Sequence, residues 1–236
     1  MGGEDHRLSA ADVTSALGWW LQAGVDVAVT ENPRNWLKAP VSPPPNVRQP
    51  SALAVSQALE TLHLFRDWLS NAPTLPLASA GTARILPQGQ ESAPVMLVAE
   101  MPAREDAAEG RPIGGEAWEL MAKMLAAAGL PAEEAYTATL SCFHAPGAKM
   151  RAEELAECAG IARQHVTLAK PKRLLLLGDA PSRALLGKPL AAARGHVHKV
   201  EGVRTIATFH PRFLLNRPSD KALAWRDLLL LMEDEG

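Results

Sequence analysis

Two residues with reactive side chains follow short apolar runs of the chain. Glu100 comes directly after the run Val95–Ala99, and His210 comes two residues after the run Arg204–Thr208. Pro211 follows the histidine and favours an extended backbone before it, which would direct the imidazole along the strand and out of a sheet. A surface carboxylate and a packed or capping histidine are the plainer alternatives. The two residues are therefore candidates for chemistry at strand ends.

The segment after Glu100 has the composition of a ligand-binding turn. Pro102 stiffens the chain, and Gly110, Gly114 and Gly115 precede a stretch with helical periodicity. Glycine lets the backbone approach a ligand closely, and a helix N-terminus favours anions. An ordinary turn between a strand and a helix would have the same composition.

Cys142 and Cys158 are the only cysteines of the chain. Two cysteines cannot supply the four ligands of a structural metal site, and free cysteine is among the residues most often buried. We therefore expect buried thiols with a packing role.

The apolar runs alternate with helical patterns from about residue 85 onward. The runs are Val95–Ala99, Tyr136–Leu140, Arg173–Leu177 and Arg204–Thr208, and the helical stretches are at about 116–129, 151–169, 179–186 and 219–233. Strands that are buried on both faces and alternate with helices indicate a parallel sheet between two helical layers. We predict a three-layer α/β/α sandwich with a central, mostly parallel, four-stranded sheet. Ligands bind at the carboxyl ends of the strands in such folds.

The N-terminal part is organised differently. Residues 9–29 have the pattern of an amphipathic helix, residues 39–51 contain five prolines, and residues 52–70 return to a helical period. We expect a helical leader at 1–38, a Pro-rich linker at 39–51 and one domain at 52–236.

Charge is distributed unevenly along the chain. Residues 137–226 carry 15 Lys and Arg against 6 Asp and Glu, and hold five of the seven histidines. A basic segment of this kind can meet a phosphate backbone, although basic side chains also simply solvate helices. No apolar stretch reaches about 18 residues, and the N-terminus does not resemble a secretory signal. We expect a cytoplasmic monomer that does not span a membrane.

Three blocks of the sequence, in order, resemble the uracil-DNA glycosylase superfamily, and most closely its iron–sulfur family-four branch. The blocks are VAEMPAREDAAEGRPIGG at 98–115, CFHAPGAKMRAEELAEC at 142–158, and the segment from RLLLLGDAPSRALLG through TIATFHPRFLLNRP to the final AWRDL. The resemblance implies DNA as the partner. It also implies that Glu100 and His210 are the catalytic residues, with a base pocket made by Ala99, Met101, Pro102, Ile113 and Ala138. Within the basic segment, we expect DNA contacts at Lys149, Arg194, Pro211 and Arg212.

The sequence departs from this family at the positions that would read the base. Ala138 stands where the family has its uracil-selecting asparagine, and Ile113 stands where a phenylalanine stacks on the base. A lost edge contact and a lost stacking face each cost about 1–3 kcal/mol. Ala99, Ala103 and Arg212 depart from the family pattern as well.

The family's iron–sulfur cluster is also unexpected here. Cys142 and Cys158 match the third and fourth cluster ligands, whereas the first cysteine pair is missing. A [4Fe–4S] cluster needs four ligands, so we expect no cofactor. Two main hypotheses remain: a glycosylase of altered base preference, and a weakly active or inactive relative that binds DNA. A nucleotide- or small-molecule-binding α/β protein is a third alternative, because a fold alone does not fix function.

Overall fold

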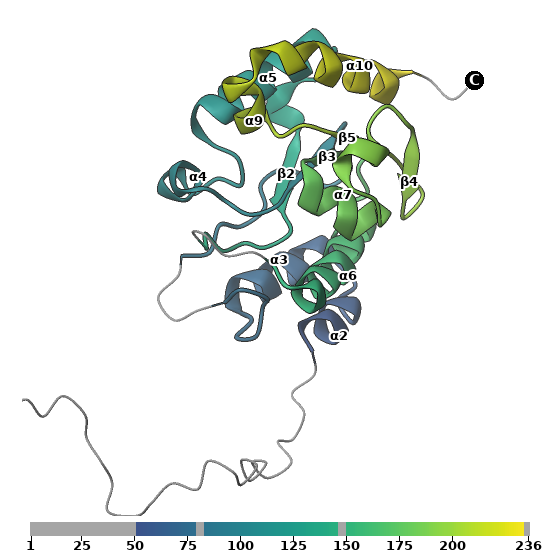
Figure 1. Ribbon diagram of the computed structural model, residues 1–236. Helices are drawn as coiled ribbons and strands as arrows, with labels where there is room; N and C mark the ends of the chain where they lie inside the picture. Colours follow the sequence, from purple (N-terminus) through teal and green to yellow (C-terminus); the bar gives the residue numbers. More distant parts are fainter. Residues whose placement is uncertain (1–50, 79–82, 146–149, 234–236) are drawn as a thin grey trace, which may run out of the picture. The chain divides into compact units, whose positions relative to one another are not determined.

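The computed structural model describes residues 51–78, 83–145 and 150–233 (Figure 1). The expected leader and, apart from Ser51, the expected linker lie outside these residues. The central sheet consists of β1 (Met96–Ala99), β2 (Tyr136–Thr139), β3 (Arg173–Leu177), β4 (His198–Val200) and β5 (Val203–Thr208). Their order across the sheet is β2-β1-β3-β5-β4, and every pairing is parallel except that of β4 with β5. The predicted fold class is thus confirmed.

The sheet has five strands, so the prediction of four was wrong by one. The additional strand, β4, is only three residues long, and only Val200 among them is buried. It pairs with β5 through a tight hairpin at Glu201 and Gly202, both of which have positive φ angles (49° and 79°). Such a short, polar edge strand has no apolar run by which it could be found in the sequence.

Helices cover both faces of the sheet. They are α2 (Ala52–Gln57), α3 (Leu62–Asn71), α4 (Arg104–Glu109), α5 (Gly115–Ala127), α6 (Ala152–Ala169), α7 (Asp179–Leu186), α8 (Leu190–Ala193), α9 (Pro211–Asn216) and α10 (Lys221–Met232), with 3-10 turns at Ala132–Glu134 and Pro218–Asp220. The continuous helical pattern expected at 52–70 is interrupted, because the Thr61 side chain accepts a hydrogen bond from the Leu64 amide and caps a new helix there. No helix of the described ranges is long and apolar enough to cross a membrane.

Two apolar cores lie on opposite faces of the sheet. Leu174 and Leu176 of β3 pack with residues of α3 and α6, whereas Leu175 and Leu177 pack with residues of α5 and α10. Side chains alternate between the faces of a strand, so a wholly apolar strand must be covered on both sides. The two helical layers are visible above and below the strands in Figure 1.

The parallel strands bring their carboxyl ends to one edge. Register pairs place Ala99 of β1 beside Thr139 of β2, and Leu177 of β3 beside Thr208 of β5. The residues that follow these strands are therefore neighbours in space, although they are far apart in the chain.

Candidate active site

Glu100 and His210 line a single pocket at the carboxyl edge of the sheet. The other lining residues are Met101, Leu177, Gly178, Arg212, Phe213 and Asn216. The pocket has a volume of about 340 Å³, within the range of small-molecule sites. Two residues that are 110 positions apart thus face one space, as the position of their strands predicts.

Glu100 is held in place by backbone pairing that continues beyond β1. The Leu140 amide donates to the Ala99 carbonyl at 2.9 Å, and the Ser141 amide donates to the Glu100 carbonyl at 3.1 Å. Desolvation raises the pKa of the Glu100 carboxyl group, and the carboxylate of Asp179 raises it further. A carboxyl group with a raised pKa is a stronger base once it is ionised.

The imidazole of His210 is fixed in one tautomer. His210 is the N-cap of α9, and its Nδ1 accepts a hydrogen bond of 3.1 Å from the Arg212 amide. Because an amide N–H can only donate, the single proton of a neutral ring must be on Nε2. Burial and, to a smaller extent, the Arg212 charge lower the pKa of His210 to about 4, although the Asp106 carboxylate partly opposes them. Near neutral pH the side chain is therefore an uncharged hydrogen-bond donor.

Asp106 connects the loop after β1 to α9, and it is not among the site residues predicted from the sequence. One carboxylate oxygen accepts from the Ala103 amide at 2.7 Å. The other accepts from the Gly114 amide at 2.6 Å and from the Arg212 guanidinium at 2.9 Å. Asp106 is only 1 % exposed, so a buried carboxylate joins three separate segments beside the pocket.

The residues expected to form the base pocket are only partly brought together. Met101 lines the pocket with Glu100, and Pro102 is buried, with its carbonyl oxygen 2.9 Å from Nδ1 of His144. Ala99 and Ile113 are 1 % exposed in the core beneath α5 and α10.

Ala138 is likewise 1 % exposed, in the core on the opposite face of the sheet. Ala99, Ile113 and Ala138 are therefore core residues in this chain and are not among the side chains that line the pocket. That they form the base pocket therefore stays a prediction from the resemblance. Small or aliphatic side chains at these positions pack into the core, where a polar amide would need hydrogen-bond partners.

The expected DNA contacts also differ in their surroundings. Arg194 makes an ion pair of 2.8 Å with the buried Asp227, and its guanidinium lies 4.2 Å from the centre of the Phe209 ring. Its side chain is 16 % exposed, so a DNA contact of Arg194 stays a prediction.

The other three expected contacts lie elsewhere. Pro211 is buried at the start of α9. Arg212 is 35 % exposed at the pocket while it contacts Asp106. Lys149 lies outside the described residues.

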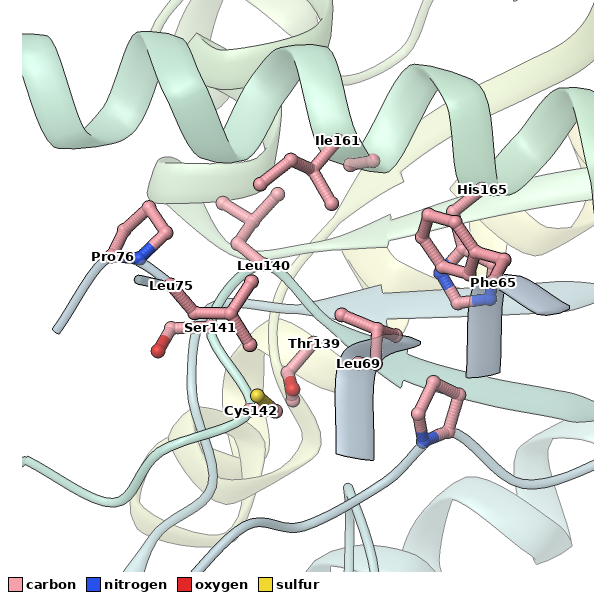
Figure 2. A pocket seen from close by; sticks show the side chains of 12 residues that line it. Phe65, Leu69, Leu75, Pro76, Thr139, Leu140, Ser141, Cys142, Ile161 and His165 are labelled. Carbon is pink, nitrogen blue, oxygen red and sulfur yellow. The ribbon is translucent and has the colours of Figure 1, made fainter. Parts of the chain in front are cut away.

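The two cysteines lie in an apolar environment. Both are buried in the core beside α6, and burial raises the pKa of Cys142 to about 11 and that of Cys158 to about 12. Figure 2 shows the adjacent cavity, which is lined by Phe65, Leu69, Leu75, Cys142, Ile161 and His165, among others. Its volume is about 20 Å³, which is room for a single water molecule. The described residues contain no group of three or more His, Cys, Asp or Glu that could hold a metal ion.

Comparison with known proteins identifies the family. The chain is 28 % identical over 141 residues to a type-4 uracil-DNA glycosylase of Archaeoglobus fulgidus. This alignment covers 55 % of this chain and 71 % of the relative. The chain is 24 % identical over 183 residues to the type-4 uracil-DNA glycosylase of Pyrobaculum aerophilum, covering 73 % of this chain and 92 % of the relative. It is also 24 % identical over 167 residues to that of Thermotoga maritima, covering 69 % and 87 %. Residues 86–229 match the model of the uracil DNA glycosylase superfamily, so the chain belongs to this superfamily, as a divergent relative of its type-4 members.

Proposed function

We propose that this protein hydrolyses the N-glycosidic bond of a deaminated or damaged base in DNA. The observation that carries the proposal is the shared pocket of Glu100 and His210 at the carboxyl edge of the sheet. The names of the relatives, all type-4 uracil-DNA glycosylases, support the same reaction class. A base can enter such a pocket only after it has left the helical stack.

The two side chains supply complementary stabilisation. When the bond between C1′ of the sugar and the base nitrogen breaks, the electron pair leaves with the base, and positive charge develops on the sugar. The Nε2–H group of His210 donates a hydrogen bond to the departing base and stabilises its negative charge. The Glu100 carboxylate stabilises the sugar cation and orients the water whose oxygen forms the new bond to C1′. The proton of this water passes to Glu100 or to solvent.

We further propose that the base preference differs from that of a dedicated uracil enzyme. Ala138 has no amide with which to read a base edge, and Ile113 has no aromatic face. The loss of a specific edge contact costs about 1–3 kcal/mol of discrimination. These same losses favour a second candidate function, in which the protein binds DNA and has weak or no glycosylase activity.

The donor set does not fit the iron–sulfur cluster of the type-4 branch. The chain has two cysteines, and a [4Fe–4S] cluster requires four ligands. Both thiols have raised pKa values and pack against apolar side chains, which disfavours the thiolate form that binds iron. We therefore propose that the protein functions without a cluster, and no step of the reaction depends on one.

The proposed partner is DNA, bound through the basic segment 137–226, which includes Arg212 at the pocket. Contacts of this kind position the backbone and do not read its sequence. We propose that the protein is a cytoplasmic monomer.

A cleavage panel tests the proposed function. Single- and double-stranded oligonucleotides carry one uracil, hypoxanthine, xanthine or oxidised base, and abasic products are cleaved with alkali and separated by size. We expect the wild-type protein to excise at least one of these bases, and Glu100→Gln to excise it much more slowly, because the amide keeps the shape and loses the charge. Binding of the oligonucleotides without excision of any base would favour the DNA-binding alternative.

A further inference from the structure

Phe213 is an exposed aromatic residue inside the proposed active site. It is 38 % exposed and lines the pocket together with Glu100 and His210. The other exposed large apolar residues of the described ranges, Leu64, Val197 and Leu229, are aliphatic and do not line this pocket. An isolated exposed apolar side chain needs no explanation, but an aromatic ring beside the candidate catalytic groups does.

The ring of Phe213 is held by a column of stacked side chains. Its centre lies 5.0 Å from that of Phe209, with an angle of 19° between the rings. The Arg194 guanidinium lies 4.2 Å from the centre of the Phe209 ring and is anchored by the buried Asp227. The column therefore extends from the core to the pocket and fixes the orientation of its outermost ring.

Besides the stacking on Phe209, the Phe213 ring has a cation–π contact with Arg217. The Arg217 guanidinium lies 5.6 Å from the Phe213 ring centre, which is longer than the 4.2 Å contact deeper in the column. Arg217 is itself 63 % exposed and pairs with Asp220 at 3.3 Å. A planar ligand can approach Phe213 when the Arg217 side chain moves aside. The free-energy cost of breaking its exposed ion pair with Asp220 is small.

We propose that Phe213 is the stacking residue of this pocket and packs against the face of the extruded nucleobase. This inference rests on the proposed function and deepens it. Ile113, at the position from which the resemblance implies stacking, is buried in the core and has no aromatic ring. The stacking face comes instead from α9, three residues after the histidine that contacts the leaving base. Because every base has a π face, stacking from this side accepts bases without reading their edges.

The test separates the contribution of the base from that of the DNA backbone. Single-stranded oligonucleotides carry one 2′-fluoro nucleotide with uracil, hypoxanthine or xanthine, and a matched oligonucleotide carries a tetrahydrofuran abasic site. The electron-withdrawing fluorine disfavours the sugar cation, so the base stays attached during the measurement. Binding is measured by fluorescence anisotropy for the wild type, Phe213→Ala, Phe213→Leu and Phe213→Trp. Leu229→Ala is the matched control at an exposed apolar position on α10.

We expect the wild type to bind at least one base-bearing oligonucleotide more tightly than the abasic one. Phe213→Ala and Phe213→Leu should weaken that binding by about 5- to 150-fold, the equivalent of 1–3 kcal/mol per stacked base. Binding of the abasic oligonucleotide should change little, and Phe213→Trp should retain the preference. Thermal unfolding of each variant shows whether it is folded.

Three results would overturn the inference while leaving the proposed function intact. They are an equal loss of affinity for base-bearing and abasic DNA, full affinity of Phe213→Leu, and no preference of the wild type for any base over the abasic site. Failure of the wild type to bind any of the oligonucleotides would instead contradict the proposed function, and the inference with it.

Discussion

Replacing Asp106 by alanine removes the carboxylate that joins the loop after β1 to α9. The Ala103 and Gly114 amides and the Arg212 guanidinium, at 2.6 to 2.9 Å, all lose their acceptor. Loss of one partner of a buried ion pair costs about 3–5 kcal/mol, and the partial exposure of Arg212 favours the lower end of this range. At about 2–4 °C per kcal/mol for a domain of this size, we expect the melting temperature to fall by roughly 6–12 °C.

Glu105→Ala is the matched control for this measurement. Glu105 is the adjacent acidic residue, is 67 % exposed and lies 4.0 Å from the same guanidinium, so its removal should cost less than about 1 kcal/mol. Thermal or urea unfolding of both variants, and of each combined with Arg212→Ala, gives the coupling energy. We expect Asp106→Ala to cost at least about 1 kcal/mol less when Arg212 is already absent. Equal melting temperatures of Asp106→Ala and Glu105→Ala would refute the claim that the buried Asp106 carboxylate stabilises the fold through these three contacts.

Three further predictions concern cofactor, DNA and pH. Protein purified without oxygen should be colourless and iron-free, with Cys142 and Cys158 titrating as thiols after unfolding; stoichiometric iron with absorbance near 400 nm would contradict this. DNA binding should weaken steeply with salt, and Arg212→Ala should reduce the slope of log K against log salt by about one unit; an unchanged slope would exclude a phosphate contact. Burial lowers the pKa of His165 to about 3 and, with the Arg212 charge, that of His210 to about 4. The unfolded chain therefore binds more protons than the folded one below about pH 6.5, and the free energy of unfolding should fall from there toward pH 4. The variant His165→Gln, which cannot be protonated, should show a flatter pH dependence of this free energy. An equally steep pH dependence would contradict the lowered pKa of His165.

The fold could be predicted because its strands are buried on both faces. Arg173–Leu177 has four consecutive leucines, and its strand bounds were predicted without error. The edge strand β4 was not predicted, because its pairing with β5 depends on a hairpin with positive φ angles and not on an apolar pattern. Continuous apolar runs thus identify central strands and miss short polar edges.

The candidate site was predictable only where strand ends determine it. Glu100 directly follows β1, and His210 comes two residues after β5, so the sheet topology alone brings them to one edge. Asp106 is one of three acidic residues within six positions of α4, and its burial depends on Arg212, 106 residues later.

The ion pair of Arg194 with Asp227 could not be predicted either, because the two residues are 33 positions apart in the chain. Neither of these long-range ion pairs leaves a local signal in the sequence. Pairs of this kind become visible only when the tertiary contacts are known.

The most direct test of the central claim is the single-turnover excision rate of His210→Ala. The substrate is the oligonucleotide from which the wild type excises the base fastest. The control is His196→Ala, which removes an exposed histidine of the same basic segment. Loss of a preorganised donor to the leaving group typically slows the reaction about 100- to 1,000-fold, and we expect this loss in His210→Ala alone, with both variants folded. Excision by His210→Ala at a rate within a few-fold of wild type would contradict the assignment of His210 as the donor to the departing base.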